Sequence, residues 1–297
     1  MNFLDFQKKF KDERSIVKHY VKIRYGGNAA CNHCGSLKVH QRPARPRIFQ
    51  CNDCDKDFSV FKGTIFEKST TDLRKWFYAI HLFLNSKKGI SGLQLQREVG
   101  VTYKTAWRML KQLRLAMGNQ CLKDVFDTIM EMDETYVGGK PRKGADGRRH
   151  PKLTDKYSEK VPVVGIKDRT KKLVYTKVIL PDDNARSLSS KQLLSILKEV
   201  AKEGSTVITD EYGGYCLVSL NNFKHLTINH SKRYVDGEIH TNGIESFWST
   251  LKRGLYGIYH SVSLKYLQNY TDEFAFRYNN KDNAEIFNLL LERSVMP

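Results

Sequence analysis

The chain has 297 residues, 40% of them hydrophobic, and its 50 Lys and Arg against 32 Asp and Glu give a net charge of +18. This composition excludes an intrinsically disordered chain and favours a basic globular protein with polyanionic partners such as nucleic acid. No apolar run reaches the ~18 residues of a membrane helix, and the N-terminus lacks the apolar segment of a signal peptide.

The first motif in the chain is a pair of CxxC sequences, Cys31 with Cys34 and Cys51 with Cys54, separated by sixteen residues. This spacing is typical of a zinc ribbon, in which four thiolates close a tetrahedral Zn²⁺ site. A closed site leaves no open position for chemistry, so we predict a structural role for the metal. The remaining two cysteines are isolated, which indicates a metal site in a reducing compartment and not a disulfide framework.

The segment after the ribbon has helical periodicity from about Thr71. Two further helices are predicted at about 91–99 and 102–117, with a turn at Gly100 between them, which is helix-turn-helix spacing. The second helix would present these residues to a DNA major groove: Tyr103, Lys104, Arg108 and Lys111. Ordinary packing of three helices, without DNA contact, is the alternative.

An apolar-rich run at residues 128–137 predicts a buried strand that contains Asp133. A lone acid is usually solvated, but apolar residues crowd this one, and burying an unpaired charge is costly. The following loop at 138–152 is broken by glycine and proline and is dense in positive charge, including Arg148 and Arg149. We expect this loop to contact DNA phosphates and to become ordered on DNA.

The next segment predicts further elements of the same sheet. In chain order they are a strand at 161–167, a turn at 168–171, a strand at 172–180, a helix at about 187–203 and a strand ending at Asp210. Three antiparallel strands, a helix and then a strand beside the first is the ribonuclease H-like order of an α/β fold with a mixed sheet. This topology would place Asp133 and Asp210 next to each other. Glu134 and Glu211 should then point to the opposite face of the sheet.

Glu245 lies in a segment, residues 240–253, whose apolar residues recur at helical spacing. Two strand carboxylates, from Asp133 and Asp210, and one helix carboxylate suit a site for two hard cations, Mg²⁺ or Mn²⁺. Paired ions of this kind stabilise both the attacking and the leaving oxygen in phosphodiester displacement. Taken singly, each acid is more often a turn, cap or solvated residue.

Several stretches of the chain resemble the insertion-sequence IS1595 transposases, which contain the ISXO2-like DDE domain and are related to the eukaryotic Merlin elements. The stretches are residues 133–140, 209–215 and 240–257, and residues 272–279 resemble the tail of that family. The N-terminal zinc ribbon is also a family feature, so the resemblance covers nearly the whole chain.

The resemblance implies that Asp133, Asp210 and Glu245 form the catalytic, metal-binding triad. It also implies that Lys252 contacts DNA, and this residue lies seven positions after Glu245, on the same helix face. Asn242 lies three positions before Glu245, and some relatives use Asn in the third catalytic place, although Glu is the better ligand for a hard cation. The residues of this helix and its start that we expect to bind DNA are Lys252, Arg253, Asn242 and His240.

The predicted organisation is an N-terminal segment with the zinc ribbon at 1–62, the helix-turn-helix region at 63–122 and the ribonuclease H-like DDE catalytic domain at 123–297. The resemblance implies a DNA transposase that binds terminal inverted repeats, cleaves DNA ends and joins 3′-hydroxyls to target DNA. Two ends must be joined, so we expect a homodimer or higher multimer on DNA. In the absence of a targeting segment we expect a nucleoid-associated protein of the bacterial cytoplasm.

Two other functions remain open on the sequence alone. A zinc-ribbon DNA-binding regulator with an inactive or domesticated transposase domain would bind DNA whether or not the acids Asp133, Asp210 and Glu245 were intact. A metal-dependent endonuclease would cut DNA without strand transfer, and joined products would discriminate against it.

Overall fold

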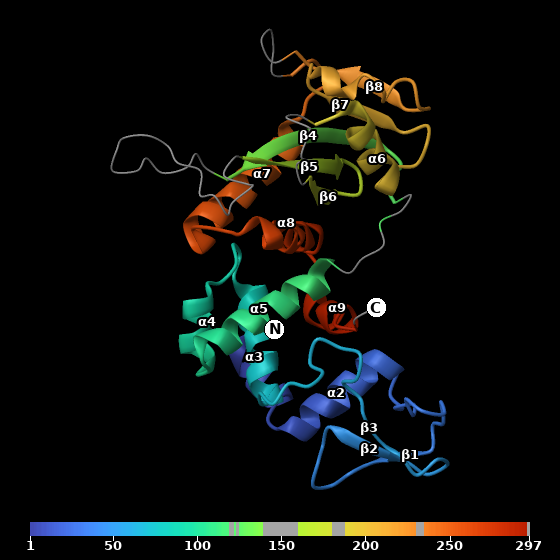
Figure 1. The fold of residues 1–297 in the computed structure, drawn as a ribbon, viewed down its shortest axis with the longest axis vertical. Coiled ribbons are helices and arrows are strands. Elements are labelled where there is room, and N and C mark those ends of the chain that lie inside the picture. Colours follow the sequence, from blue (N-terminus) through green and yellow to red (C-terminus); the bar gives the residue numbers. More distant parts are fainter. Residues whose placement is uncertain (119–121, 123–124, 139–159, 180–187, 230–234, 296–297) are drawn as a thin grey trace, which may run out of the picture. The chain divides into compact units, whose positions relative to one another are not determined.

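The chain forms two compact units in the computed structural model, Met1–Gln120 together with Asp282–Pro297, and Cys121–Lys281 (Figure 1). The structure describes residues 1–118, 122, 125–138, 160–179, 188–229 and 235–295. Within these ranges no helix combines the length and the apolar character that a membrane crossing requires. The division into 1–62, 63–122 and 123–297 concerns functional segments and stays a prediction. The compact units divide the chain differently, because its last helix packs with the N-terminal helices.

The first unit begins with two short helices and a small sheet. Its elements are α1 (Phe3–Lys9), α2 (Glu13–Tyr25), β1 (Val39–Gln41), β2 (Ile48–Cys51) and β3 (Asp57–Ser59), with the strands antiparallel in the order β1-β2-β3. Asp12 caps α2 because its side chain accepts from the Ser15 amide while the Ser15 hydroxyl bonds back to the cap residue. The helix ends at Gly26, whose φ of +71° is left-handed.

Four more helices complete this unit: α3 (Leu73–Asn85), α4 (Gly92–Val99), α5 (Tyr103–Gly118) and α9 (Ile286–Glu292). The predicted helix-turn-helix spacing is present, because α4 ends at Gly100, with φ of +65°, and α5 begins three residues later. The core is aromatic, since Phe10, Phe77 and Trp76 are fully buried and Phe10 stacks on Phe287 of α9.

The second unit is built on a five-stranded mixed sheet. Its strands are β4 (Ile129–Val137), β5 (Val161–Asp168), β6 (Leu173–Val178), β7 (Thr206–Thr209) and β8 (Lys224–Thr227), in the order β6-β5-β4-β7-β8. β4, β5 and β6 pair antiparallel, whereas β7 runs parallel to β4 and β8 parallel to β7. This is the predicted ribonuclease H-like order, with one further parallel strand, β8, that the sequence pattern did not predict.

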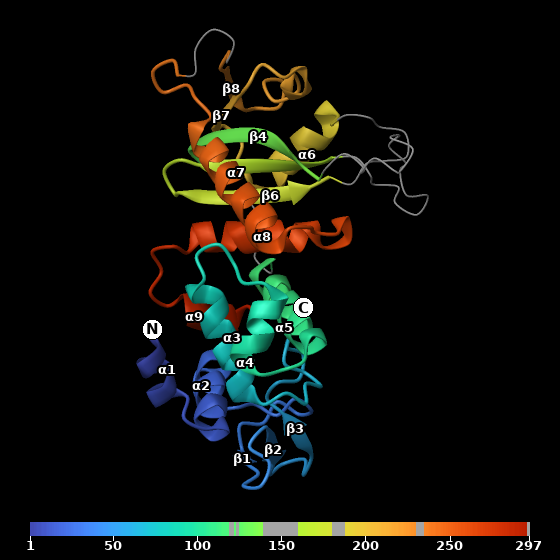
Figure 2. The same cartoon turned by 90° about the vertical axis from the view of Figure 1, so that its left-hand side faces the viewer.

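Helices cover both faces of the sheet. Helix α6 (Ser190–Val200) packs on one face against Met130 and Met132. Helices α7 (Asn242–Gly254) and α8 (Leu264–Asn279) pack on the other face, where α7 crosses the strands (Figure 2). Successive residues of a strand point to opposite faces, so the odd-numbered residues of β4 face α7. Asp133 is one of them.

Helix α8 also covers the outer edge of β6. Asn279 accepts from the amide of Val174 at 2.7 Å and donates to its carbonyl at 2.9 Å. Gln268 accepts from the amide of Val178 at 2.8 Å and donates to the carbonyl of Thr176 at 3.0 Å. Two side-chain amides therefore take the place of a neighbouring strand along β6 and cover this edge of the sheet.

Asn279→Ala should destabilise the second unit by about 1–3 kcal/mol, because it leaves the amide and carbonyl of Val174 without their partner. Chemical denaturation of the full-length protein would measure the change. Asn280→Ala is the matched control, since Asn280 is equally half-buried but, among the residues that the structure describes, donates to the carbonyl of Phe276 in its own helix and not to the sheet. Equal losses of stability in the two variants would contradict the role of Asn279 at the sheet edge.

Candidate functional site

The pairing of β4 with β7 aligns the two aspartates that the sequence singled out. The parallel register sets Ile129 beside Thr206 and Glu131 beside Ile208, and continuing it by two residues sets Asp133 beside Asp210. Neighbouring strands lie about 4.8 Å apart, and residues at the same register share a face. Asp210 directly follows β7, and its carboxylate accepts from the amide of Tyr212 at 3.0 Å. The two acids lie close enough for the negative charge of Asp210 to raise the pKa of Asp133.

Asp133 is held by a contact from helix α7. The indole Nε1 of Trp248 donates to Oδ2 of Asp133 at 2.9 Å. The indole can lie there because the residue opposite Asp133 on β5 is Gly165, and a Cβ at Gly165 would lie 2.5 Å from the indole ring. The Trp248 contact fixes one carboxylate oxygen of Asp133 and ties α7 to the centre of the sheet.

Burial, together with the negative charges of Glu134 and Asp210, raises the pKa of Asp133 to about 7 against the lowering effect of the Trp248 hydrogen bond. Burial also raises the pKa of Glu134. A cation bound between the carboxylates would reverse this tendency, because it favours their charged forms. The electrostatics of the site thus suit a positively charged ligand.

Glu245 lies on α7 one helical turn before Trp248, and its side chain is exposed. The hydroxyl of Thr241 donates to Oε1 of Glu245 at 2.7 Å. Helix α7 packs on the sheet through Ile244, Phe247 and other apolar residues. Glu245 is therefore an exposed residue of the same helix whose Trp248 contacts Asp133. Among the described residues, only the cysteines of the ribbon bring three or more ligand atoms within 4.8 Å of one another; the carboxylates of Asp133, Asp210 and Glu245 do not all lie within this distance of one another.

The other acids of β4 have protein partners. Glu134 points to the face opposite Asp133, as expected, where Tyr215 donates to its Oε2 at 2.5 Å. Glu131 shares the face of Asp133 and is 1% exposed. Its Oε1 accepts from Nε of Arg169 at 2.7 Å and its Oε2 from the amide of Ile244, also at 2.7 Å.

The sequence interpretation did not include Glu131 or Arg169. A glutamate in an apolar run was the available signal, because a buried charge requires a partner. His240, predicted to contact DNA, lies in this network: Nη2 of Arg169 is 2.9 Å from its Nδ1 and donates to its carbonyl at 2.6 Å. Glu211, beside Asp210, is exposed.

The structure places the other predicted DNA-binding residues on two helices and outside the described ranges. Asn242 and Arg253 are exposed on α7, and Lys252 is half-buried there. Tyr103, Lys104 and Arg108 are exposed on α5, at the start of the second helix of the helix-turn-helix. Arg148 and Arg149 lie outside the described residues.

The four cysteines of the ribbon converge as the CxxC spacing predicts. Cys31 and Cys54 have their sulfurs 3.7 Å apart, Cys34 and Cys51 have theirs 3.6 Å apart, and all four sulfurs lie within 4.8 Å of one another. Tetrahedral zinc with Zn–S bonds of about 2.3 Å requires sulfur separations of about 3.8 Å. The donor set and its geometry therefore fit a structural Zn²⁺ site.

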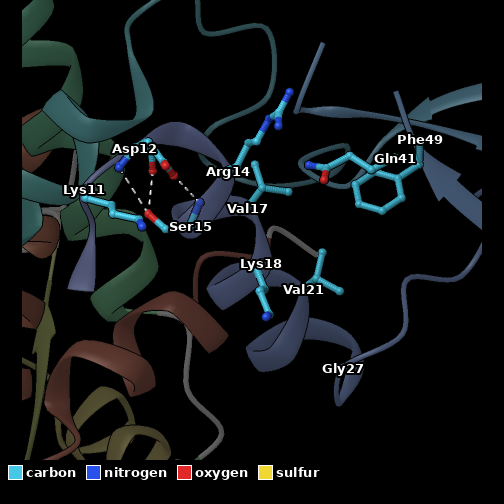
Figure 3. Close-up of a pocket in the computed structure, with 10 residues that line it drawn as sticks. All are labelled: Lys11, Asp12, Arg14, Ser15, Val17, Lys18, Val21, Gly27, Gln41 and Phe49. Atoms are coloured by element: carbon cyan, nitrogen blue, oxygen red, sulfur yellow. Dashed lines mark hydrogen bonds between the residues drawn. The ribbon is translucent and has the colours of Figure 1, made fainter. Parts of the chain in front are cut away.

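A basic pocket lies between α2 and the ribbon strands (Figure 3), with a cavity volume of about 550 Å³. Three cationic side chains line it, Lys11, Arg14 and Lys18, beside Gln41 of β1 and Phe49 of β2. Arg14 donates to the carbonyl of Pro43 at 2.9 Å, so part of its donor capacity serves the fold.

Arginines of the ribbon are also engaged within the protein. Arg42 and Arg45 pair with Asp57, and Arg47 pairs with Glu13 and donates to the carbonyls of Ser69 and Thr71. These three arginines therefore make contacts within the first unit.

Comparison with known families matches residues 126–279 to the ISXO2-like transposase domain and residues 11–57 to the transposase zinc-ribbon domain. The chain belongs to the ISXO2-like transposase family. The domain match spans the described sheet and helices α6, α7 and α8, and so includes Asp133, Asp210 and Glu245.

The names of two relatives refer to a transposable element and to a transposase. A protein named as an uncharacterized protein in transposable element ISH50 of Halobacterium salinarum is 28% identical over 302 residues, covering 97% of this chain and 99% of the relative. An uncharacterized transposase-like protein of Haemophilus influenzae is 32% identical over 109 residues, 37% of this chain and 83% of the relative. The Mos1 transposase paired-end complex with left transposon end matches at 11% identity and a TM-score of 0.30, covering 74% of this chain and 79% of the Mos1 chain.

The pH dependence of stability should report the burial of Asp133. A carboxyl whose pKa is raised on folding, here from 3.8 to about 7, binds its proton more tightly in the folded state. Its contribution to stability is present below pH 4 and is lost as the pH rises through about 7. Asp133→Asn should flatten this decline in thermal-unfolding profiles of metal-free protein, and Glu211→Gln should not. An unchanged profile in Asp133→Asn would contradict the burial effect.

Cys51→Ser should abolish zinc binding and unfold the ribbon, because three thiolates cannot close the tetrahedral site. Elemental analysis of the purified protein would measure the zinc content, and proteolysis would report the unfolding. Cys216→Ser is the control, since Cys216 is exposed in the second unit and remote in sequence from the ribbon. Wild-type zinc content in Cys51→Ser would argue against the four-thiolate site.

Proposed function

We propose that the chain is a DNA transposase whose catalytic residues are Asp133, Asp210 and Glu245. The main support is the register of β4 and β7, which aligns the two aspartates, together with helix α7, which bonds Asp133 through Trp248. Membership of the ISXO2-like transposase family supports the same assignment.

The three carboxylates would hold the catalytic cations, since two belong to the register of neighbouring strands and the third lies on the helix that contacts Asp133 through Trp248. Divalent ions bound there, Mg²⁺ or Mn²⁺, would neutralise charge on the phosphate and favour deprotonation of the attacking water. Trp248 would keep Oδ2 of Asp133 oriented, and Thr241 would keep Oε1 of Glu245 oriented.

The reaction would proceed by two displacements at phosphorus. In the first, a water oxygen bonds to the scissile phosphorus at an element end, the bond to the 3′ oxygen breaks, and a 3′-hydroxyl is released. In the second, this hydroxyl attacks a phosphodiester of the target and displaces a target 3′-hydroxyl. No covalent bond to the protein forms, so catalysis would rest on positioning and on charge neutralisation.

DNA binding would use both units of the chain. The net charge of +18 favours a polyanionic partner, and the zinc ribbon at 1–62 with the helix-turn-helix at 63–122 would bind the terminal repeats. The side chains proposed to contact DNA are Tyr103, Lys104, Arg108, Arg148, Arg149, His240, Asn242, Lys252 and Arg253. Pairing of two ends would require a dimer or higher multimer.

The test is a strand-transfer reaction with full-length protein, labelled DNA containing candidate element ends, supercoiled target and Mg²⁺. We expect cleaved ends and joined products from the wild type, and a loss of at least ~100-fold in Asp210→Asn, because a ligand oxygen and its charge are removed. Glu211→Gln, at the exposed neighbouring position, should retain activity.

The outcomes separate the competing functions. Cleavage without joined products would support a metal-dependent endonuclease. Tight binding of the ends with no cleavage by the wild type would support a DNA-binding regulator with an inactive domain. Equal activity in Asp210→Asn and the wild type would overturn the proposed catalytic site.

A further inference from the structure

The N-terminus of α7 is capped by a residue from the sheet. Thr241 occupies the cap position, but its side chain makes no cap hydrogen bond to the first turn. The amide of Ile244, which a cap side chain ordinarily serves, donates instead to Oε2 of Glu131 on β4, at 2.7 Å and 113 residues away in sequence. The negative charge of Glu131 also suits the positive end of the helix dipole.

Two other residues, Arg169 and Gly243, allow the buried carboxylate of Glu131 to lie at the start of α7. Arg169 donates to its Oε1 at 2.7 Å and compensates a carboxylate that is only 1% exposed. Gly243, in the first turn of α7, provides the space for this carboxylate because it has no side chain. A Cβ there would lie 2.7 Å from Oε2 of Glu131 and would collide with Nζ of Lys167.

The hydroxyl of Thr241 contacts a side chain of the helix and makes no cap hydrogen bond. A threonine at a helix N-cap normally accepts a hydrogen bond from the first turn. Here Glu131 serves the Ile244 amide, and Thr241 donates its hydroxyl to Oε1 of Glu245 at 2.7 Å. The contact reaches across one helical turn, so it restricts the rotamer of Glu245.

We propose that Glu131 is a positioning residue, which caps α7 from the sheet and so allows Thr241 to orient Glu245 for metal binding. This inference rests on the proposed function of Glu245. Glu131 itself is not assigned as a ligand, although it shares the face of Asp133, because Arg169 and the Ile244 amide each engage one of its oxygens. Arg169 also donates to the carbonyls of Glu238 and His240, which fixes the chain just before the helix.

The test measures Mn²⁺ affinity of the full-length protein from the electron paramagnetic resonance signal of free Mn²⁺, and strand transfer beside it. Thr241→Val keeps the shape of the side chain and removes the donor, so Mn²⁺ affinity should fall about 10-fold or more, while Thr241→Ser should remain near the wild type. Glu131→Gln should weaken Mn²⁺ binding in the same direction, because it loses the charge that engages Arg169 and the helix end.

Thr250→Val is the matched control, because Thr250 lies on the same helix and its hydroxyl donates to the carbonyl of Ser246 at 3.2 Å and accepts from Arg253 at 3.3 Å, both in α7. A merely structural role would lower the melting temperature of Thr241→Val and Glu131→Gln and leave the Mn²⁺ affinity unchanged, which would overturn the proposal. Weakened Mn²⁺ binding in both variants and recovery in Thr241→Ser would support it.

Strand transfer separates this inference from the proposed function. Wild-type protein that binds Mn²⁺ and transfers no strand would refute transposition, while the effect of Thr241→Val on Mn²⁺ would still support the positioning role. Wild-type protein that transfers strands, with Thr241→Val and Glu131→Gln unchanged in their Mn²⁺ dependence, would refute the positioning role alone.

Discussion

The packing of helix α7 on strand β4 is the contact on which the candidate site depends. Two polar side chains of β4 reach this helix, Glu131 at its first turn and Asp133 at Trp248 in its second. Ile244, Phe247 and Leu251 of the helix are buried in the apolar cluster beside the sheet, but apolar contacts are not directional. The two hydrogen bonds specify the position of the helix along the strand, and therefore the position of Glu245.

This arrangement places charge inside a sheet, where it is costly, and the surrounding residues offset the cost in different ways. Glu131 is compensated by an arginine and by a helix N-terminus. Asp133 receives a neutral indole donor, and its pKa is raised by burial. A buried carboxylate with a positively charged partner is stabilised in its charged form without a ligand. A carboxylate whose pKa is raised by burial is stabilised in its charged form when a cation binds to it. The two acids of one strand face are thus suited to different tasks, one structural and one for binding.

Glycine makes both contacts sterically possible. Gly165 leaves room for the indole of Trp248 beside Asp133, and Gly243 leaves room for the carboxylate of Glu131 beside the first turn of α7. Neither Gly165 nor Gly243 has a positive φ, so the backbone conformation does not require glycine at these positions. Close approach of a neighbouring side chain is the reason for glycine at these two positions.

The sequence predicted the elements whose signal is local. The CxxC spacing, the strand around Asp133, the hairpin at 168–171 and the helix-turn-helix all have residue patterns that recur within a few positions, and the described structure contains them. Strand β8 was not predicted, because Lys224–Thr227 is mostly exposed and has no apolar alternation.

The network around Glu131 was not predicted for a different reason. Arg169 is 38 residues from Glu131 in sequence and the Ile244 amide is 113 residues away, so no local pattern indicates either partner. Such contacts follow from topology, because β5 turns beside β4 and α7 crosses both strands. The sequence could show that a buried acid needs a partner, and only the fold could show which one.

The edge of the sheet limits how copies of this chain could assemble. Asn279 and Gln268 occupy the outward backbone groups of β6 at Val174, Thr176 and Val178. A second copy could not extend the sheet across β6 without displacing α8, which also packs through Phe274 against Gly254 of α7. Displacing α8 would therefore disturb the helix that bears Glu245. A multimer that keeps the site intact must use other surfaces, and DNA that bridges two copies would meet this requirement without any new strand pairing at β6.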